Sequence, residues 1–201
     1  MGNGEGYCPC KDKAFEIAAK MLEADVVILA SPVYAHDVSG SMKNFIDRMA
    51  YNCYRQSLAG KTAFAVTTSG VGSTPRAVKT MTTALELWGC CVAGTLRLRT
   101  GGSIISGELE AMHGKAVKAA ARRIFGRLQP GEPRPSMRSL IVFKVQQMAW
   151  QKDKERSITR EFWDERGWLD KRCTYYVPHR TSRILTAAAR MTGAAVAVFF
   201  V

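Results

Sequence analysis

Two short loops hold the residues whose types and spacing are most suggestive of chemistry. The first, residues 31–40 (SPVYAHDVSG), follows an apolar run, and the second, residues 67–73 (TTSGVGS), follows another. Pro32 stiffens the first loop, and glycines at 40, 70 and 72 permit positive φ and close approach of a ligand to the backbone. Free backbone N–H groups in such loops suit a flat, electron-rich ligand. Proline and glycine are also common in ordinary turns, so a purely structural role stays open.

The segments around these loops predict alternating strands and helices. Apolar runs rich in β-branched residues predict strands at 25–31, 61–69 and 90–99. Helical periodicity predicts helices at 13–23, from a cap at Ser39 to about Gly60, from Pro75 to about Trp88, and at 107–128. Short strand–helix connections predict a parallel sheet with right-handed crossovers. The carboxyl ends of adjacent parallel strands share one edge, so the two loops should be neighbours.

A proline-rich stretch, residues 129–136 (QPGEPRPS), predicts a boundary between two parts of the chain. We expect an α/β domain over 1–129 and a helical C-terminal extension over 130–201. In the extension, five aromatic side chains are expected to pack together: Phe162, Trp163, Trp168, Tyr175 and Tyr176. The terminal helix is expected to be amphipathic, with a protein partner rather than a membrane span. Its bulky face comprises Ile184, Leu185, Ala188, Met191, Ala195, Val196, Phe199 and Phe200.

The composition is that of a globular protein, with 201 residues, 47% hydrophobic residues and a net charge of +12. The excess charge forms no block of five like residues, and no nucleic-acid motif accompanies it, so no nucleic-acid partner is predicted. The N-terminus has no apolar core of a signal peptide, so a cytoplasmic location is expected, without a membrane partner. The six cysteines are scattered, which favours free thiols over a disulfide framework.

Residues 25–48 are similar to the central motif of the flavodoxin-like family of NADPH-dependent FMN reductases, including its iron-sulfur flavoprotein branch. The shared pattern is an apolar strand, SPVY, four variable residues, SG, one residue, MK, one residue and FIDR. The TTSGVGS loop and the LELWGCCVAGTL passage agree with the same family, and FWDERGWLDKRCTYY resembles an extension that some members carry. The resemblance runs from about Cys8 onward and implies an α/β fold with a flavodoxin-like, three-layer parallel sheet.

The resemblance also implies an FMN site in which two loops embrace the isoalloxazine ring, largely through backbone groups. Carried onto this chain, the flavin-lining residues are Ser31, Pro32, Val33, Tyr34, Ala35, His36, Ser69, Gly70, Val71 and Gly72. His36 could tune the flavin potential or donate a proton, or it could be a solvated loop residue. Lys43, Asp47 and Arg48 follow on the helix, where structural ion pairs are the simpler interpretation.

Several family features have no counterpart in this sequence. The family begins with a strand, a phosphate-binding loop of the type GSPRxxGNT, a helix and a second strand, so we expect an N-terminally truncated domain with family strands 3, 4 and 5. The missing phosphate loop predicts weakened FMN affinity. In the flavodoxin order 2-1-3-4-5, the strand at 25–31 would lose a neighbour, and a homo-oligomer is expected to cover its edge.

Cys8 and Cys10 resemble a remnant of the cysteine cluster of the iron-sulfur members. Two thiolates are fewer than the four that an iron-sulfur cluster generally requires. Plain thiols are therefore expected, and neither a cluster nor another metal site is predicted.

The leading interpretation is an FMN-dependent NAD(P)H oxidoreductase that passes electrons to a quinone, a free flavin or another small acceptor. The cofactor carries the chemistry in such proteins, so no catalytic side chain is assigned. The alternative is a non-catalytic member of the fold that acts as a dimerisation or partner-binding module. The missing phosphate loop and the apolar terminal helix motivate that alternative.

Overall fold

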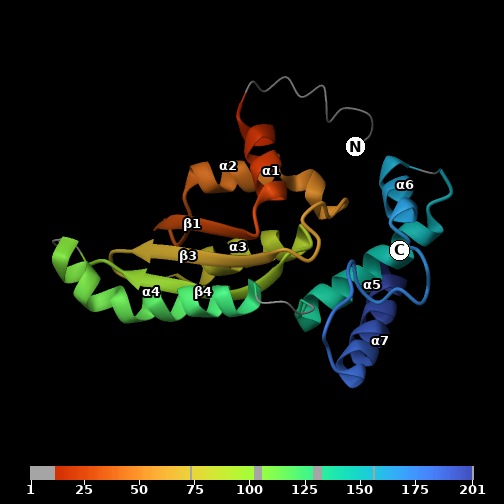
Figure 1. Cartoon of the computed structure of the whole chain (residues 1–201). Helices are drawn as coiled ribbons and strands as arrows, with labels where there is room; N and C mark the ends of the chain where they lie inside the picture. Colours follow the sequence, from red (N-terminus) through yellow and green to blue (C-terminus); the bar gives the residue numbers. More distant parts are fainter. Residues whose placement is uncertain (1–11, 73, 102–105, 129–132, 156, 201) are drawn as a thin grey trace.

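A four-stranded sheet forms the centre of the α/β part of the molecule (Figure 1). The computed structural model describes residues 12–72, 74–101, 106–128, 133–155 and 157–200. The strand order is β2-β1-β3-β4. Strands β1 (Val26–Tyr34), β3 (Thr62–Ser69) and β4 (Cys91–Arg99) are parallel, and β2 (Asp37–Val38) pairs antiparallel with β1. The predicted α/β class with a mostly parallel sheet is confirmed; the short antiparallel strand was not predicted.

Helices occupy the predicted segments and begin at the expected signals. The bounds are α1 (Ala14–Glu23), α2 (Gly40–Arg48), α3 (Pro75–Leu87), α4 (Ser106–Leu128), α5 (Met137–Lys152), α6 (Ile158–Glu165) and α7 (Arg183–Phe200), with a 3₁₀ helix, η2, at Ala50–Cys53. Ser39 caps α2, because its hydroxyl accepts a hydrogen bond from the Met42 N–H. Pro75 stands in the first turn of α3, where its missing N–H removes no helical bond.

Two predicted boundaries were wrong. Strand β1 continues to Tyr34, so Pro32 lies inside the strand rather than after it. Proline has no N–H to donate, and a strand tolerates it where no neighbouring strand would accept that hydrogen bond. On the outer side of β1, pairing with β2 begins only at Val33. Helix α2 ends at Arg48 rather than near Gly60, and the following residues turn inward to bury Met49 and Leu58.

The main hydrophobic core lies on the face of the sheet that α1 and α3 cover. Val27 and Leu29 of β1 and Ala63 and Ala65 of β3 point into it, where they meet the fully buried Trp88. The helices hold these strands in register, so the loops after β1 and β3 are fixed relative to each other.

The opposite face of the sheet is only partly covered. Helix α4 packs on β3 and β4, and a Cβ on Gly94 would lie 2.9 Å from the Arg123 guanidinium of that helix. Ile28 belongs to the same face, since it lies opposite Phe64 in the register, yet 52% of its surface is exposed. Within the described residues, β2 is the one strand on the outer side of β1, at Val33 and Tyr34. The sequence-predicted open edge therefore spans residues 26–32.

The C-terminal part packs around its aromatic side chains, as predicted. Phe143 of α5 stacks on Trp163 of α6, and Trp168, Tyr175 and Tyr176 complete the buried cluster. The indole N–H of Trp163 donates to the Tyr54 carbonyl at 2.8 Å and so joins this cluster to the α/β part. The predicted division into 1–129 and 130–201 stays a prediction, and residues 129–132 lie outside the described ranges.

Candidate functional site

The first loop is a tight β-hairpin rather than an open corner. Tyr34 pairs with Asp37, and the two residues between them, Ala35 and His36, form the turn. Both turn residues have positive φ, at 48° and 67°, which is the geometry of a type I′ turn. For a residue with a Cβ, the left-handed backbone conformation costs roughly 1–2 kcal/mol of conformational free energy. Backbone strain of this kind is frequent at functional sites, so it marks the hairpin tip as a candidate site.

A buried serine ties the strand to the helix that follows. Ser31 is 3% exposed, and its hydroxyl accepts a hydrogen bond from the Ser39 N–H at 3.0 Å while it donates to the Pro32 carbonyl at 2.8 Å. The hydroxyl of Ser39 in turn receives the Met42 N–H. Ser31 therefore fixes the hairpin from inside. The side chains at its tip, Tyr34, Ala35 and His36, are exposed.

The second loop is closed by Ser69, the last residue of β3. Ser69 accepts a hydrogen bond from the Gly72 N–H at 3.0 Å, and its carbonyl accepts the Thr100 N–H at 2.9 Å. Gly72 has a φ of 116°, whereas Gly40 and Gly70 do not have positive φ, contrary to the role suggested for all three glycines. Val71 projects from the loop with 99% of its surface exposed.

The tertiary structure brings both predicted loops to one edge of the sheet. Pro32 lies opposite Thr68 in the parallel register, so the hairpin and the second loop leave neighbouring strand ends. Tyr34, 65% exposed, and Val71 are large side chains that the described residues leave uncovered there. Among those residues, none accepts a hydrogen bond from the N–H groups of Gly70 and Val71.

A third strand end joins the same edge, and the sequence analysis missed it. A Cβ on Gly72 would lie 3.0 Å from the guanidinium of Arg99, the last residue of β4, and one on Gly70 would lie 3.3 Å from the Gly101 carbonyl. The absence of side chains at both glycines lets β4 and its loop approach the second loop. The rule that ligands bind beyond the carboxyl ends of parallel strands would have pointed to Arg99.

These groups fit the ring half of a flavin. An exposed tyrosine, an exposed valine and two backbone N–H groups that find no acceptor among the described residues are suited to a flat ring with acceptor atoms at its rim. The described residues contain no glycine-rich loop between a strand end and a helix that would match the phosphate loop of the family. Within the described residues, the two loops therefore offer walls for the ring of a flavin.

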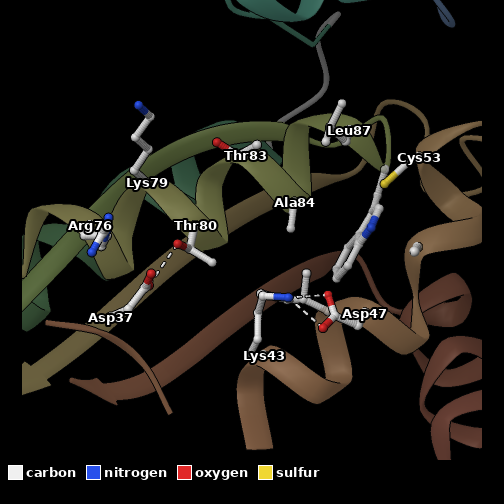
Figure 2. A pocket seen from close by; sticks show the side chains of 13 residues that line it. Asp37, Lys43, Asp47, Cys53, Arg76, Lys79, Thr80, Thr83, Ala84 and Leu87 are labelled. Atoms are coloured by element: carbon white, nitrogen blue, oxygen red, sulfur yellow. Dashed lines mark hydrogen bonds and ion pairs between the residues drawn. The ribbon is translucent and has the colours of Figure 1, made fainter. Parts of the chain in front are cut away.

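A cavity of about 490 Å³ lies between α2 and α3 and begins at Asp37, directly after the hairpin turn (Figure 2). On the α2 wall, Lys43 is paired with Asp47 at 2.6 Å. On the α3 side, Thr80 donates a hydrogen bond to Asp37 at 2.9 Å.

Two other cations line the same cavity, Arg76 and Lys79 of α3. No carboxylate in the described part of the chain lies within ion-pair distance of either. Their positive charge is therefore available to an anion, and Arg76 follows the second loop by only three residues.

The described cysteines are poorly suited to redox or nucleophilic chemistry. Burial raises the pKa of Cys90 to about 12 and that of Cys91 to about 11, and it raises the pKa of Cys53 and Cys173 as well. All four stay protonated thiols near neutral pH. Cys8 and Cys10 lie outside the described ranges. Within those ranges, no three His, Cys, Asp or Glu side chains are grouped closely enough to hold a metal ion.

Across the described residues, no helix combines the length and the apolar character that crossing a bilayer requires.

Comparison with known proteins shows what the α/β part of the chain is similar to. Residues 2–99 match the family model described as NADPH-dependent FMN reductase. An iron-sulfur flavoprotein of Archaeoglobus fulgidus is 36% identical over 106 residues, which are 52% of this chain and 47% of that protein. An iron-sulfur flavoprotein of Methanocaldococcus jannaschii is 52% identical over 48 residues, 24% of this chain and 25% of that protein. This chain therefore spans less than half the length of either relative.

Two solved structures are also similar to part of this chain. A Trp repressor binding protein from Bacillus subtilis is 22% identical, with a TM-score of 0.46 over 57% of this chain and 73% of its own. A WrbA-like flavodoxin from Agrobacterium tumefaciens is 19% identical, with a TM-score of 0.41 over 54% and 73%. The family match rests on the sequence of residues 2–99, which contain both loops and all four strands. Over this stretch, just under half of its length, the chain is similar to the family of NADPH-dependent FMN reductases.

Proposed function

We propose that this chain binds FMN at the edge formed by the two loops and acts as an NAD(P)H-dependent oxidoreductase. The observation that carries the proposal is the pairing of β1 with β3, which brings the strand ends that lead to the exposed Tyr34 and the exposed Val71 to one edge, within the stretch that matches the reductase family. Bound FMN would supply two-electron chemistry, with a nicotinamide nucleotide as reductant and a quinone or other small molecule as acceptor.

The residues of the chain would bind and orient the cofactor rather than react. The hairpin tip and Val71 would sandwich the ring, and the free N–H groups of Gly70 and Val71 would face its acceptor atoms. His36, exposed at the tip, would lie near the ring edge, where it could supply a proton. Ser31 would act as a positioning residue, since its buried hydroxyl holds the hairpin.

Arg76 and Lys79 are our candidates to attract the phosphate. They carry charge that no described carboxylate neutralises, and Arg76 stands just after the second loop. A cation near the surface attracts a phosphate without the geometric cradle of a phosphate loop, so the expected affinity is modest.

We also propose that a second copy of the chain covers the open edge of β1. Beside this edge lies a groove of about 350 Å³, to which α1, β1 and α2 contribute and in which Lys20 is the one charged residue. An apolar strand with unpaired N–H and C=O groups pairs readily with another strand. Two copies of β1 would bring no like charges together.

The test is a titration of the purified chain with FMN, followed by its visible spectrum and by quenching of flavin fluorescence. Binding in the micromolar range, together with FMN-dependent oxidation of NADPH or NADH in the presence of a quinone, is the expected result. A chain that is folded by circular dichroism but neither shifts the FMN spectrum nor oxidises either nucleotide would favour the alternative, a non-catalytic partner-binding module.

A further inference from the structure

Helix α7 has two opposite faces, and one is fixed against α5, beside which it lies (Figure 1). Ala189, Gly193 and Ala197 recur every four residues, and all three are buried. A Cβ on Gly193 would lie 2.7 Å from the Cβ of Lys144 and 3.0 Å from the Ile141 carbonyl, both on α5. This close contact determines which side of α7 points away from the molecule.

The outward side carries a heptad stripe. Ile184, Met191 and Val198 are spaced by seven and are 84%, 75% and 71% exposed. The exposed Ala188 and Ala195 lie between them, which gives the alternating spacing of four and three that marks a coiled-coil seam. The seam contains no charge. The guanidinium of Arg190 is directed elsewhere, because it donates to the Lys171 carbonyl at 2.8 Å.

We propose that this seam is a dimer interface, in which α7 of one copy pairs antiparallel with α7 of a second copy. The proposal is independent of the flavin site and of the edge of β1. In such a dimer, the second copy would be the protein partner that the amphipathic sequence of α7 predicts.

The order of large and small residues favours a second copy in the antiparallel direction. In that arrangement Ile184 lies opposite Ala195 of the other copy, and Met191 lies opposite Ala188, so each of these two large side chains meets a small one. Such alternation lets facing layers interdigitate. A parallel pair would place Met191 against its own copy and would align the two helix dipoles, which repel each other in that direction.

The size of the exposed surface is also that of an interface. With Leu185 and Phe199, which is 85% exposed, the seam presents on the order of 600 Å² of apolar surface, close to the roughly 800 Å² that each partner buries in a standard interface. A lipid surface is the less suitable occupant. Helices that lie on membranes are rich in Lys and Arg on their polar face, whereas α7 carries two arginines and no lysine in 18 residues, and its other face packs on α5.

The direct test is Met191→Glu in the full chain, measured by sedimentation equilibrium over a range of concentrations. Each dimer would bury two unpaired carboxylates, so the dissociation constant should rise by about 100-fold or more. At working concentration the mass should fall to half that of the wild type, whether or not the edge of β1 is also paired. Met112→Glu is the matched control, since Met112 of α4 is 59% exposed and lies outside the seam.

The orientation is tested by mixing two variants that each fail to self-associate. Ile184→Glu and Ala195→Lys should each lower self-association, because each places like or unpaired charges in the seam. An equimolar mixture should recover a heterodimer, since antiparallel pairing sets the new carboxylate opposite the new ammonium group. Failure of the mixture to associate, with both variants folded, would contradict the antiparallel arrangement.

Two results would overturn the proposal altogether. One is a wild-type chain that is monomeric at tens of micromolar, or whose mass is unaffected by Met191→Glu. The other is a monomer that co-sediments with vesicles of phosphatidylcholine and phosphatidylserine in a Met191-dependent manner, which would assign the seam to a lipid surface. An unchanged circular dichroism spectrum and a cooperative thermal transition of Met191→Glu would show that loss of the dimer is not loss of the fold; the melting temperature itself is expected to fall where the dimer stabilises the wild type.

Discussion

The buried hydroxyl of Ser31 accepts a hydrogen bond from the backbone N–H of Ser39, eight residues later, at 3.0 Å. This contact joins the end of β1 to the start of α2 and closes the hairpin between them. We expect Ser31→Ala to lower the free energy of unfolding by about 1–2 kcal/mol, because it leaves a poorly solvated N–H without a partner. Chemical denaturation measures the change. Ser41→Ala, at an exposed position of α2, is the control and should be nearly neutral; equal losses in both variants would contradict this role.

Tyr34 should matter for flavin binding rather than for stability, because 65% of its surface is exposed. We expect Tyr34→Ala to weaken FMN binding by about tenfold, since stacking of an aromatic side chain on a flat ring contributes roughly 1–3 kcal/mol. Fluorescence titration gives the affinity. Tyr54→Ala, at a tyrosine that is 47% exposed and remote from the loops, should bind as the wild type does. Equal affinity of all three proteins would place the ring elsewhere.

Arg76 should act on the phosphate of the cofactor and not on its ring. We expect Arg76→Gln to weaken binding of FMN several-fold, with little effect on riboflavin, which has the same ring but no phosphate. The difference should shrink at high salt, because the charge is exposed to solvent. Arg122→Gln on α4 controls for the loss of one positive charge. A similar effect of Arg76→Gln on both ligands would indicate a structural role.

Association of two copies through the open edge of β1 can be tested by a substitution on that strand. We expect Ile28→Lys to reduce self-association, because lysine on an edge strand blocks the approach of another strand. Light scattering after size-exclusion chromatography measures the mass, and Val117→Lys, at a residue 45% exposed on α4, is the control. A mass that depends on Met191 but not on Ile28 would leave α7 as the interface and exclude pairing at β1.

Alkaline pH should destabilise the fold through its buried thiols. The pKa of Cys90 rises from 9.0 to about 12 on folding, so the stability that its protonation gives is complete below pH 9. Between pH 9 and 12 the unfolded chain loses the proton first, and the free energy of unfolding therefore falls as the pH rises. Cys90→Ala should show a shallower fall between pH 8 and 10.5 in urea denaturation. Identical slopes would show that Cys90 does not contribute.

The sequence alone determined the order of the strands and helices, because each element carries its own local signal. The apolar run at Val26 to Leu29, the cap at Ser39 and the proline at position 75 all act within a few residues. The two loops could also be predicted as neighbours, since parallel strands share their carboxyl edge. The resemblance to the reductase family added FMN as the expected cofactor.

Only the tertiary structure decided how these segments are used. The hairpin depends on β2, a strand of two residues without a recognisable local pattern, and on positive φ at Ala35 and His36, which their residue types do not favour. The approach of Arg99 to Gly72 joins residues from different strands. On α7, the sequence shows two apolar faces, but only the contact of Gly193 with α5 determines that the face with the small residues is buried and Met191 is left exposed.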